Sequence, residues 1–253
     1  MGPLLFILFI NDLPLNVTHS ELDMYADDTT LTVKGKTTEE LESKLNEDMQ
    51  NVSDWCIRNK MKANTNKTKV MMITTRQKRQ TIPIENRELN VYLGNEKLGN
   101  AETEKLLGVK LNNNMSWEQH ITHILSIANR KLALLRRIKK YLPLRTRKLF
   151  YNAHILPHLD YCSAVWGTSP HVQKLCKLQK RAARVILDVK DIRFPSALMF
   201  ERLGWMPLQD RIAYRKLVLV HKALHQSAPA YITNMFKYIH ELRNRTTRSS
   251  RQK

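Results

Sequence analysis

Two adjacent carboxylates, Asp27 and Asp28, are the residues of this chain best suited to chemistry. They lie between two segments with strand character, Glu21–Tyr25 and Thr29–Val33, the second of which alternates apolar residues with threonines. A strand, an acidic two-residue turn and a second strand place both carboxylates at the tip of a hairpin. Paired carboxylates suit divalent cations at a nucleotidyl-transfer site, where metal ions hold the attacking and leaving oxygens. Because acidic pairs are also common in solvated turns, the pair alone leaves both interpretations open.

The segments after this turn are expected to form a helix and further strands that support it. Thr37 and Glu40 form a capping box that begins a helix. An apolar stripe continues this helix through Leu41, Leu45, Met49, Val52 and Trp55. After it, the pattern predicts a strand at 70–74, an exposed loop at 77–87, a hairpin turning at Gly94-Asn95, and a strand at 106–111.

From Trp117 onward the apolar pattern has a helical period. Ser116 is expected to cap the first helix, whose buried stripe comprises Ile121, Ile124, Leu125, Ala128, Leu132, Leu135 and Ile138. Further helices are expected at 144–156, 172–187 and 208–225. In the helix at 172–187 the apolar positions Val172, Leu175, Ala182 and Ile186 are expected to be buried, with lysines and arginines exposed between them.

Charge is distributed unevenly along the chain, whose formal net charge is +19. Residues 1–111 contain 15 Lys and Arg against 16 Asp and Glu, whereas residues 112–253 contain 27 against 7. This asymmetry indicates that the second half holds a polyanion. The alternatives are a basic surface that serves only solubility, and contact with an anionic membrane surface. No apolar run reaches the roughly 18 residues that a transmembrane helix needs.

The N-terminal apolar run and the cysteines indicate the cellular compartment of the protein. Leu4–Ile10 has neither the basic flank nor the small-residue cleavage site of a signal peptide, and it reads instead as a helix end that packs on neighbouring structure. The three cysteines are far apart and form no Cys-x-x-Cys motif. We therefore expect an intracellular protein, nuclear or cytoplasmic, that is not secreted.

Five blocks along the chain carry a family resemblance. They are Gly2-Pro3-Leu4-Leu5-Phe6 with Phe9-Ile10-Asn11-Asp12-Leu13-Pro14; Tyr25-Ala26-Asp27-Asp28-Thr29; Asn66-Lys67-Thr68-Lys69-Val70-Met71; Leu106-Leu107-Gly108-Val109 with Trp117 and His120-Ile121; and Leu156–Tyr161 with Trp166-Gly167 and Gln179–Arg184. In their order and spacing these blocks resemble the reverse transcriptase, an RNA-directed DNA polymerase, of non-LTR, LINE-type retrotransposons. The third block departs from the family, because Ala63-Asn64 stands where the family has Leu-Asn.

The resemblance implies an α+β fold. A partial polymerase palm, which is an antiparallel sheet with helices, would occupy residues 1–111. An all-helical basic thumb and post-thumb region would occupy residues 112–240, followed by a basic disordered tail at 241–253. In the family, fingers and a palm strand bearing a third metal-binding aspartate precede these parts. We therefore expect a C-terminal palm and thumb fragment that is inactive alone.

The resemblance also implies roles for particular residues. Asp27 would be the stronger ligand of Mg²⁺ and Asp28 the supporting one, at a site that joins a deoxynucleoside triphosphate to the primer 3′-hydroxyl. Lys67 matches a family lysine that protonates the leaving pyrophosphate, although a solvated loop lysine is an equal alternative. Tyr25 would shape the turn near the primer end, and Gly108 would let the primer strand approach the backbone closely.

The basic helices would form a sequence-independent clamp on the duplex of RNA template and DNA primer. The residues expected to bind nucleic acid there are Arg130, Arg136, Arg137, Lys139, Lys140, Arg145, Arg147, Lys148, Lys177, Lys180, Arg181 and Arg184. Two other interpretations stay open: a non-catalytic nucleic-acid-binding remnant, and the product of a decayed insertion. Neither a membrane nor a protein partner is expected.

Overall fold

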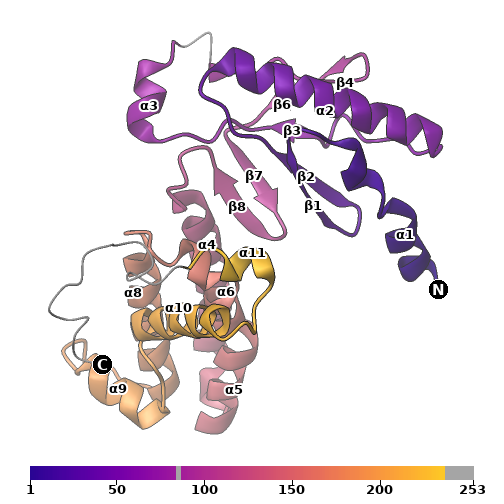
Figure 1. Cartoon of the computed structure of the whole chain (residues 1–253). Coiled ribbons are helices and arrows are strands. Elements are labelled where there is room, and N and C mark those ends of the chain that lie inside the picture. The colour runs from indigo at the N-terminus through magenta and orange to yellow at the C-terminus, as the bar shows by residue number, and fades with distance from the viewer. Residues whose placement is uncertain (84–86, 237–253) are drawn as a thin grey trace, which may run out of the picture. The chain divides into compact units, whose positions relative to one another are not determined.

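The computed structural model describes residues 1–83 and 87–236, and the chain divides into two units (Figure 1). The first unit runs from Met1 to Ser116, and the second begins at Trp117. The basic tail expected at 241–253 lies outside the described residues, as do residues 237–240 of the expected thumb region.

The first unit mixes helices with short strands, in agreement with the expected α+β class. Its helices are α1 (Gly2–Ile10), the 3-10 helix η1 (Leu13–Asn16), α2 (Thr38–Arg58) and α3 (Arg76–Thr81). Its strands are β1 (Glu21–Tyr25), β2 (Asp28–Thr32), β3 (Lys69–Val70), β4 (Tyr92–Leu93), β5 (Glu96–Lys97), β6 (Gly99–Asn100), β7 (Thr103–Leu106) and β8 (Val109–Asn112).

The strands of the described residues form four two-stranded pairs instead of one continuous antiparallel sheet. The pairs β1–β2, β4–β5 and β7–β8 are antiparallel hairpins, whereas β3 pairs with β6 in parallel. The hairpin expected around Gly94-Asn95 is confirmed as β4–β5. The expectation of an antiparallel sheet therefore holds for the local hairpins and not for the unit as a whole.

Helix α2 begins as the sequence predicts. The Thr37 side chain accepts a hydrogen bond from the Glu40 backbone N–H at 3.2 Å. The Glu40 carboxylate accepts from the Lys36 N–H at 2.8 Å, so it closes the turn one residue earlier than a standard capping box does. Helix α2 packs against η1 and β4 (Figure 1), and the most deeply buried positions of its apolar stripe are Met49, Val52 and Trp55.

Three segments of the first unit differ from the sequence prediction. The strand expected at 70–74 is reduced to β3, which ends at Val70. The strand expected at 106–111 is instead a hairpin, because Leu107 and Gly108 both have positive φ, at 45° and 86°, and form the turn between β7 and β8. The loop expected at 77–87 begins with α3, whose N-cap Thr75 accepts a hydrogen bond from the Lys78 N–H. Residues 84–86 of that loop lie outside the described part of the chain.

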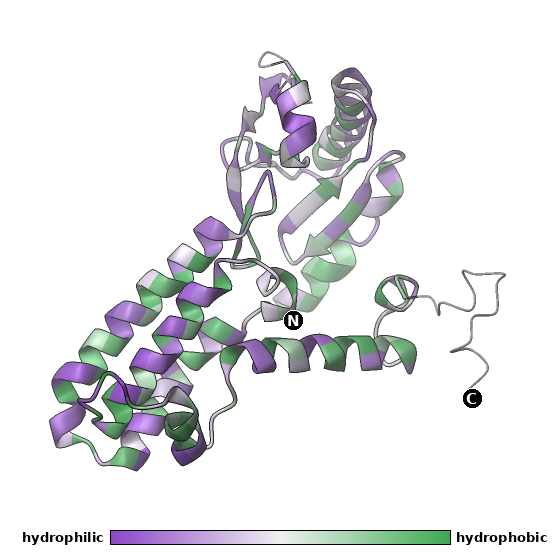
Figure 2. Cartoon of the chain, turned by 90° about the vertical axis from the view of Figure 1, so that its left-hand side faces the viewer, coloured by the Kyte–Doolittle hydropathy of each residue, from purple (hydrophilic) through white to green (hydrophobic). Residues whose placement is uncertain are grey.

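Helix α1 is apolar on nearly every side, as the green segment beside the N label in Figure 2 shows. Ile10 is buried and Phe6 packs against the cluster that contains Trp55, but Leu4 and Leu8 are 62% and 65% exposed. The expectation that this run packs on neighbouring structure therefore holds only for its inner side. Within residues 1–83 and 87–236, no helix combines the length and the apolarity needed to cross a bilayer.

The second unit is helical throughout its described part. Its elements are α4 (Glu118–Ile138), the 3-10 helix η3 (Lys139–Tyr141), α5 (Leu144–His154), α6 (Leu156–Asp160), α7 (Ser163–Trp166), α8 (Val172–Leu187), α9 (Ser196–Leu203), α10 (Leu208–Leu224) and α11 (Ala230–Thr233). The bounds predicted for the helix at 172–187 are confirmed.

Two boundaries in the second unit differ from the prediction. The helix expected at 144–156 ends at His154, and α6 begins at Leu156 with Pro157 in its first turn, because a proline has no N–H to continue the α5 ladder. The N-cap of α4 is Trp117, with φ +63°, and not Ser116. The apolar stripe of α4 nevertheless packs as expected, with Ile121, Ala128 and Leu135 fully buried.

Polar side chains, of which Gln179 is buried and Asp160 half-buried, join α10 to its neighbours. Gln179 of α8 donates to the Met206 carbonyl at 3.0 Å and accepts from the Leu208 N–H at 2.8 Å. Asp160, at the end of α6, accepts two hydrogen bonds from Arg211, at 2.6 and 2.7 Å, and forms an ion pair with Arg215 at 2.9 Å. These interactions give the helical unit a fixed framework on which its cations are displayed.

Candidate functional site

The β1–β2 hairpin turns at Ala26 and Asp27. Tyr25 pairs with Asp28 across the ladder, so Asp28 is the first residue of β2 and not part of the turn. Ala26 adopts φ +54°, a left-handed conformation that is unfavourable for a residue with a Cβ atom. The sequence placed both carboxylates in the turn, whereas the structure puts Asp27 in the turn and Asp28 on the strand. Both residues are exposed.

The two faces of this hairpin differ in polarity. Directly paired residues of an antiparallel ladder share a face, so Tyr25 and Asp28 lie on the same side as Asp23, which pairs with Thr30. On the opposite face, Leu22, Met24 and Leu31 pack against the cluster that contains Trp55. Asp23 is a further carboxylate on the outer face that sequence reasoning missed. The alternation of apolar and acidic residues in Glu21–Tyr25 was the signal that could have found it.

Asp48 of α2 holds the segment that leads into β1. Its side chain is fully buried and accepts hydrogen bonds from three backbone N–H groups: Thr18 at 2.8 Å, His19 at 3.1 Å and Ser20 at 2.7 Å. Burial on its own would raise the pKa of Asp48, but hydrogen bonds from residues 18–20 outweigh it and leave this pKa below its ordinary value. Asp48 is therefore a charged anchor that fixes where the hairpin begins.

A second interaction fixes the segment that precedes the hairpin. The indole N–H of Trp55 donates to the Asp12 carboxylate at 3.1 Å, and the Trp55 side chain is only 2% exposed. Asp12 is the residue just before η1, so this bond ties the N-terminal helical turns to α2. Helix α2 thus positions the hairpin through Asp48 at one point and through Trp55 at another.

The donor chemistry of the hairpin fits a hard divalent cation, because Asp27 and Asp28 offer carboxylate oxygens. Among the residues that the structure describes, however, no three His, Cys, Asp or Glu side chains come close enough to hold a metal ion together. The pair is therefore a partial ligand set. Any ion bound there takes its remaining ligands from outside this pair, such as water or the phosphates of a substrate.

Lys67 and Gly108 both lie in exposed turns. Lys67 is exposed in a turn before β3, where its backbone N–H donates to the Asn64 side chain at 3.1 Å. No hydrogen bond or ion pair joins its ammonium group to Asp27 or Asp28 in the described part of the chain. Gly108 is an exposed turn residue with a φ of +86°. This positive φ is a sufficient reason for glycine to stand at position 108.

The cations expected to bind nucleic acid fall into three groups. Some are already bound within the protein: Lys139 forms an ion pair with Asp188, and Arg147 donates to the carbonyls of Leu142 and Ile186 at 2.8 and 3.0 Å. Lys148 and Arg184 are half-buried. The exposed cations are Arg130, Arg136, Arg137, Lys140, Arg145, Lys177, Lys180 and Arg181.

Residues 1–111, which include the hairpin, match the family described as "Reverse transcriptase (RNA-dependent DNA polymerase)". Residues 1–111 are therefore similar to reverse transcriptases. The second unit begins at Trp117 and lies wholly beyond this match, but two curated relatives cover more of the chain. The expected resemblance to reverse transcriptases is therefore confirmed.

Two relatives from Drosophila melanogaster carry that wider similarity. The "Probable RNA-directed DNA polymerase from transposon X-element" is 25% identical over 195 residues, which is 74% of this chain and 21% of the relative. The "RNA-directed DNA polymerase from mobile element jockey" is 25% identical over 202 residues, again 74% of this chain and 21% of the relative. The chain thus spans about a fifth of the length of the curated relatives it matches. No solved structure matches it.

Proposed function

We propose that this chain forms palm and thumb parts of a transposon reverse transcriptase that copies RNA into DNA. The observation that carries the proposal is the hairpin itself: Asp27 and Asp28 lie exposed at its end, inside the segment that matches the family. The second unit, with most of the positive charge, would hold the duplex of RNA template and DNA primer while deoxynucleoside triphosphates are added.

Asp27 and Asp28 are the residues that would hold Mg²⁺. Magnesium is commonly bound by one or two carboxylates together with substrate phosphates, which agrees with a pair that lacks a third protein ligand among the described residues. When bound, the ion supplies charge neutralisation at the triphosphate and activation of the primer 3′-hydroxyl. The chain's own part is to hold both carboxylates at a fixed point, through Asp48 and the apolar underside of the hairpin.

Tyr25, Lys67 and Gly108 keep the roles that the resemblance implies, as proposals. The Tyr25 ring is 67% exposed and lies opposite Asp28, so it is available to border the primer end. The Lys67 ammonium could give a proton to pyrophosphate only if substrate binding brought the two within hydrogen-bond reach. Gly108 would let a strand pass close to the β7–β8 turn.

The test is the Mg²⁺ dependence of binding to a recessed RNA–DNA duplex that carries a fluorescent label. Fluorescence anisotropy is measured with and without Mg²⁺ at constant ionic strength, because Mg²⁺ otherwise competes with the protein for phosphates. We expect Mg²⁺ to tighten binding by the wild-type chain, and Asp27→Asn to remove that gain. Asp54→Asn, which removes an exposed carboxylate from α2, is the matched control and should keep the gain.

A non-catalytic nucleic-acid-binding protein is the second candidate, and the exposed cations of the helical unit favour it. It predicts binding that depends steeply on monovalent salt, does not respond to Mg²⁺ and is the same in Asp27→Asn. The same titration therefore separates the two functions. A Mg²⁺ response that persists in Asp27→Asn would place the metal away from the hairpin and contradict the first.

A further inference from the structure

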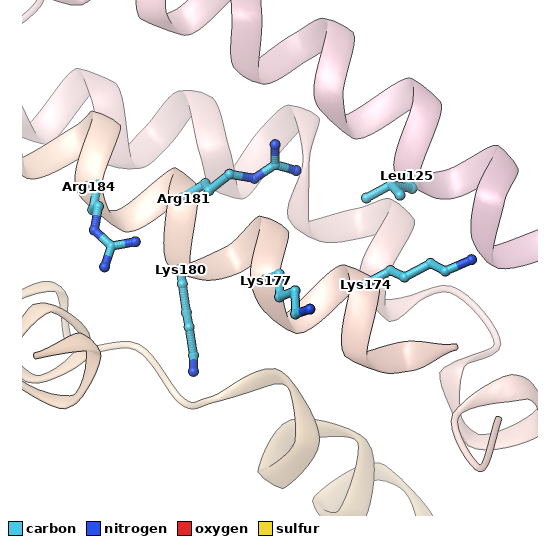
Figure 3. A pocket seen from close by; sticks show the side chains of 6 residues that line it. All are labelled: Leu125, Lys174, Lys177, Lys180, Arg181 and Arg184. Atoms are coloured by element: carbon cyan, nitrogen blue, oxygen red, sulfur yellow. The ribbon is translucent and has the colours of Figure 1, made fainter. Parts of the chain in front are cut away.

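The outward side of α10 carries apolar side chains, unlike that of α8. On α8 the exposed side bears cations such as Lys177 and Lys180, which Figure 3 shows beside a groove of about 410 Å³. On α10 the exposed positions include Tyr214, Leu217 and Leu224, and the first two are 59% and 67% exposed. The outward side of α10 therefore offers apolar contact in a unit whose other surfaces are basic.

These positions share one face of α10, which we call the α10 face. Tyr214, Leu217, His221 and Leu224 follow one another at intervals of three, four and three residues, which is the spacing of a helix side that packs on another helix. At roughly 100° for each residue, this face lies opposite the side that Ile212 buries within the unit. The α10 face thus has the spacing of a packed surface, yet it is exposed in the single chain.

The cations of α10 lie away from this face. Arg211, Arg215, Lys216 and Lys222 are each roughly a quarter turn or more from its centre at His221. The net charge of +19 opposes association between copies of this chain in general. Two α10 faces can nevertheless meet without placing these cations directly opposite one another.

Two histidines stand at the C-terminal end of the α10 face. His221 lies in the last turn of α10 and His225 is the C-cap. Both are exposed, and the centroids of their rings are 4.2 Å apart. Histidines four residues apart on one side of a helix can bind the same Zn²⁺ ion. Within the ranges that the structure describes, no third His, Cys, Asp or Glu joins them, so the pair supplies two of the four ligands of a closed zinc site.

We propose that Zn²⁺ joins two copies of this chain through His221 and His225 of each copy, with the two α10 faces packed beside the ion. A two-fold axis through the ion brings the same two histidines from both chains, and four imidazole nitrogens complete a tetrahedral site. A second copy is the occupant of the α10 face because it supplies the two missing ligands and a matching apolar surface together. This inference does not depend on the proposed function.

The apolar contact alone is too small to hold two chains together. Even if Tyr214, Leu217 and Leu224 each buried as much surface as a whole aromatic side chain, about 150–250 Å², their sum would stay below the roughly 800 Å² for each partner in a stable interface. The ion must therefore supply the remaining affinity. The chain is expected to be monomeric when zinc is removed.

The experiment measures the mass and the zinc content of the whole chain in solution. Sedimentation equilibrium gives the mass in EDTA and in ZnCl₂, and equilibrium dialysis counts the zinc bound by each chain. We expect a monomer in EDTA, and in ZnCl₂ a dimer that holds one ion for every two chains. His221→Ala and His225→Ala should each abolish the dimer, because each removes two of the four ligands. His154→Ala removes an exposed histidine of α5 and should leave the dimer intact.

A second pair of variants tests the apolar part of the face. Leu217→Lys should abolish the dimer, because it sets like charges against each other where the two faces meet. Leu149→Lys is the control, since Leu149 on α5 is 65% exposed and lies outside the face. All of the substituted positions are exposed, so the variants should keep the far-UV circular dichroism of the wild-type chain.

Four results would overturn the proposal. The first is a dimer that is equally stable in EDTA, which would mean that zinc is not needed. The second is a zinc-dependent dimer that persists in His221→Ala or in Leu217→Lys. The third is a monomer that binds one Zn²⁺ through the histidine pair, which would leave the α10 face to some other partner. The fourth is the absence of bound zinc. Each of these results leaves the test of Mg²⁺ at Asp27 unaffected.

Discussion

Replacing Asp48 should destabilise the first unit by about 3 kcal/mol. The carboxylate is fully buried and accepts from three backbone N–H groups of residues 18–20. Hydrogen bonds to a charged acceptor contribute about 1.5–3 kcal/mol each, and a buried donor left without a partner costs about 1–3 kcal/mol. In Asp48→Asn one oxygen becomes an NH₂ group that faces N–H donors, so at least one of these hydrogen bonds is replaced by a repulsive approach of two donors.

The contribution of Asp48 should also depend on pH. Its pKa in the folded protein lies below the ordinary value of 3.8, so the unfolded chain binds the proton more readily. The stabilisation is therefore fully present above that ordinary value, and it is lost as the pH falls through the lower pKa of the folded state. In Asp48→Asn this part of the acid sensitivity should disappear, because no titrating group remains at that position.

The loss of stability in Asp48→Asn is measured by urea denaturation combined with amide hydrogen exchange. Because two units can unfold separately, far-UV circular dichroism alone does not show which unit has lost stability. Amide exchange in a peptide spanning residues 12–32 reports on the hairpin and on the segment that leads into it. Glu47→Gln is the control, since Glu47 is 60% exposed and its carboxylate pairs with the His19 ring. Two results would refute the reasoning. One is a change in the free energy of unfolding of Asp48→Asn below about 0.5 kcal/mol, which is the range of an ordinary surface substitution. The other is amide exchange that increases only beyond Trp117.

Three further substitutions test the framework. Asp160→Asn should lower the stability of the second unit by about 2 kcal/mol, because Arg211 loses its bidentate acceptor; an unchanged urea midpoint would contradict this. Gly108→Ala should cost about 1 kcal/mol, because φ is +86° there; thermal denaturation measures it, and a neutral result would mean that the turn relaxes. Ala26→Gly should stabilise the hairpin by up to about 1 kcal/mol, because it relieves a left-handed alanine; faster amide exchange in β1 and β2 would contradict this.

Local signals in the sequence predicted elements well where the neighbouring residues decide the conformation. Helix α8 has the predicted bounds because its apolar spacing is regular and no proline interrupts it. The start of α2 follows from Thr37. The β7–β8 turn was missed because Leu107 and Gly108 lie within an apolar run that also fits a strand, and Leu107 accepts an unusual positive φ. The one-residue shift at Asp28 has a similar cause, since Ala26 is not a typical turn residue.

The parts of the site that depend on distant residues could not be predicted from local patterns. Asp48 lies about 30 residues from the N–H groups it binds, and nothing in its own helix distinguishes it from an exposed acid. The hydrogen bonds of Arg147 and the ion pair of Lys139 likewise depend on how α5 and η3 lie near the end of α8. Charge counts identified the basic half of the chain, but only the structure shows that Lys139 is paired within the protein whereas Lys140 is exposed.

Primer extension tests the central claim most directly. In a chimera, residues 1–253 replace the matched part of the X-element polymerase, and the protein is supplied with an RNA template, a labelled DNA primer, Mg²⁺ and all four deoxynucleotides. The account predicts extension that Asp27→Asn abolishes and that Asp54→Asn leaves intact, with duplex binding by the three proteins unchanged in the absence of Mg²⁺. Extension by the Asp27→Asn chimera at the rate of the unsubstituted one would contradict the assignment of the hairpin as the catalytic site.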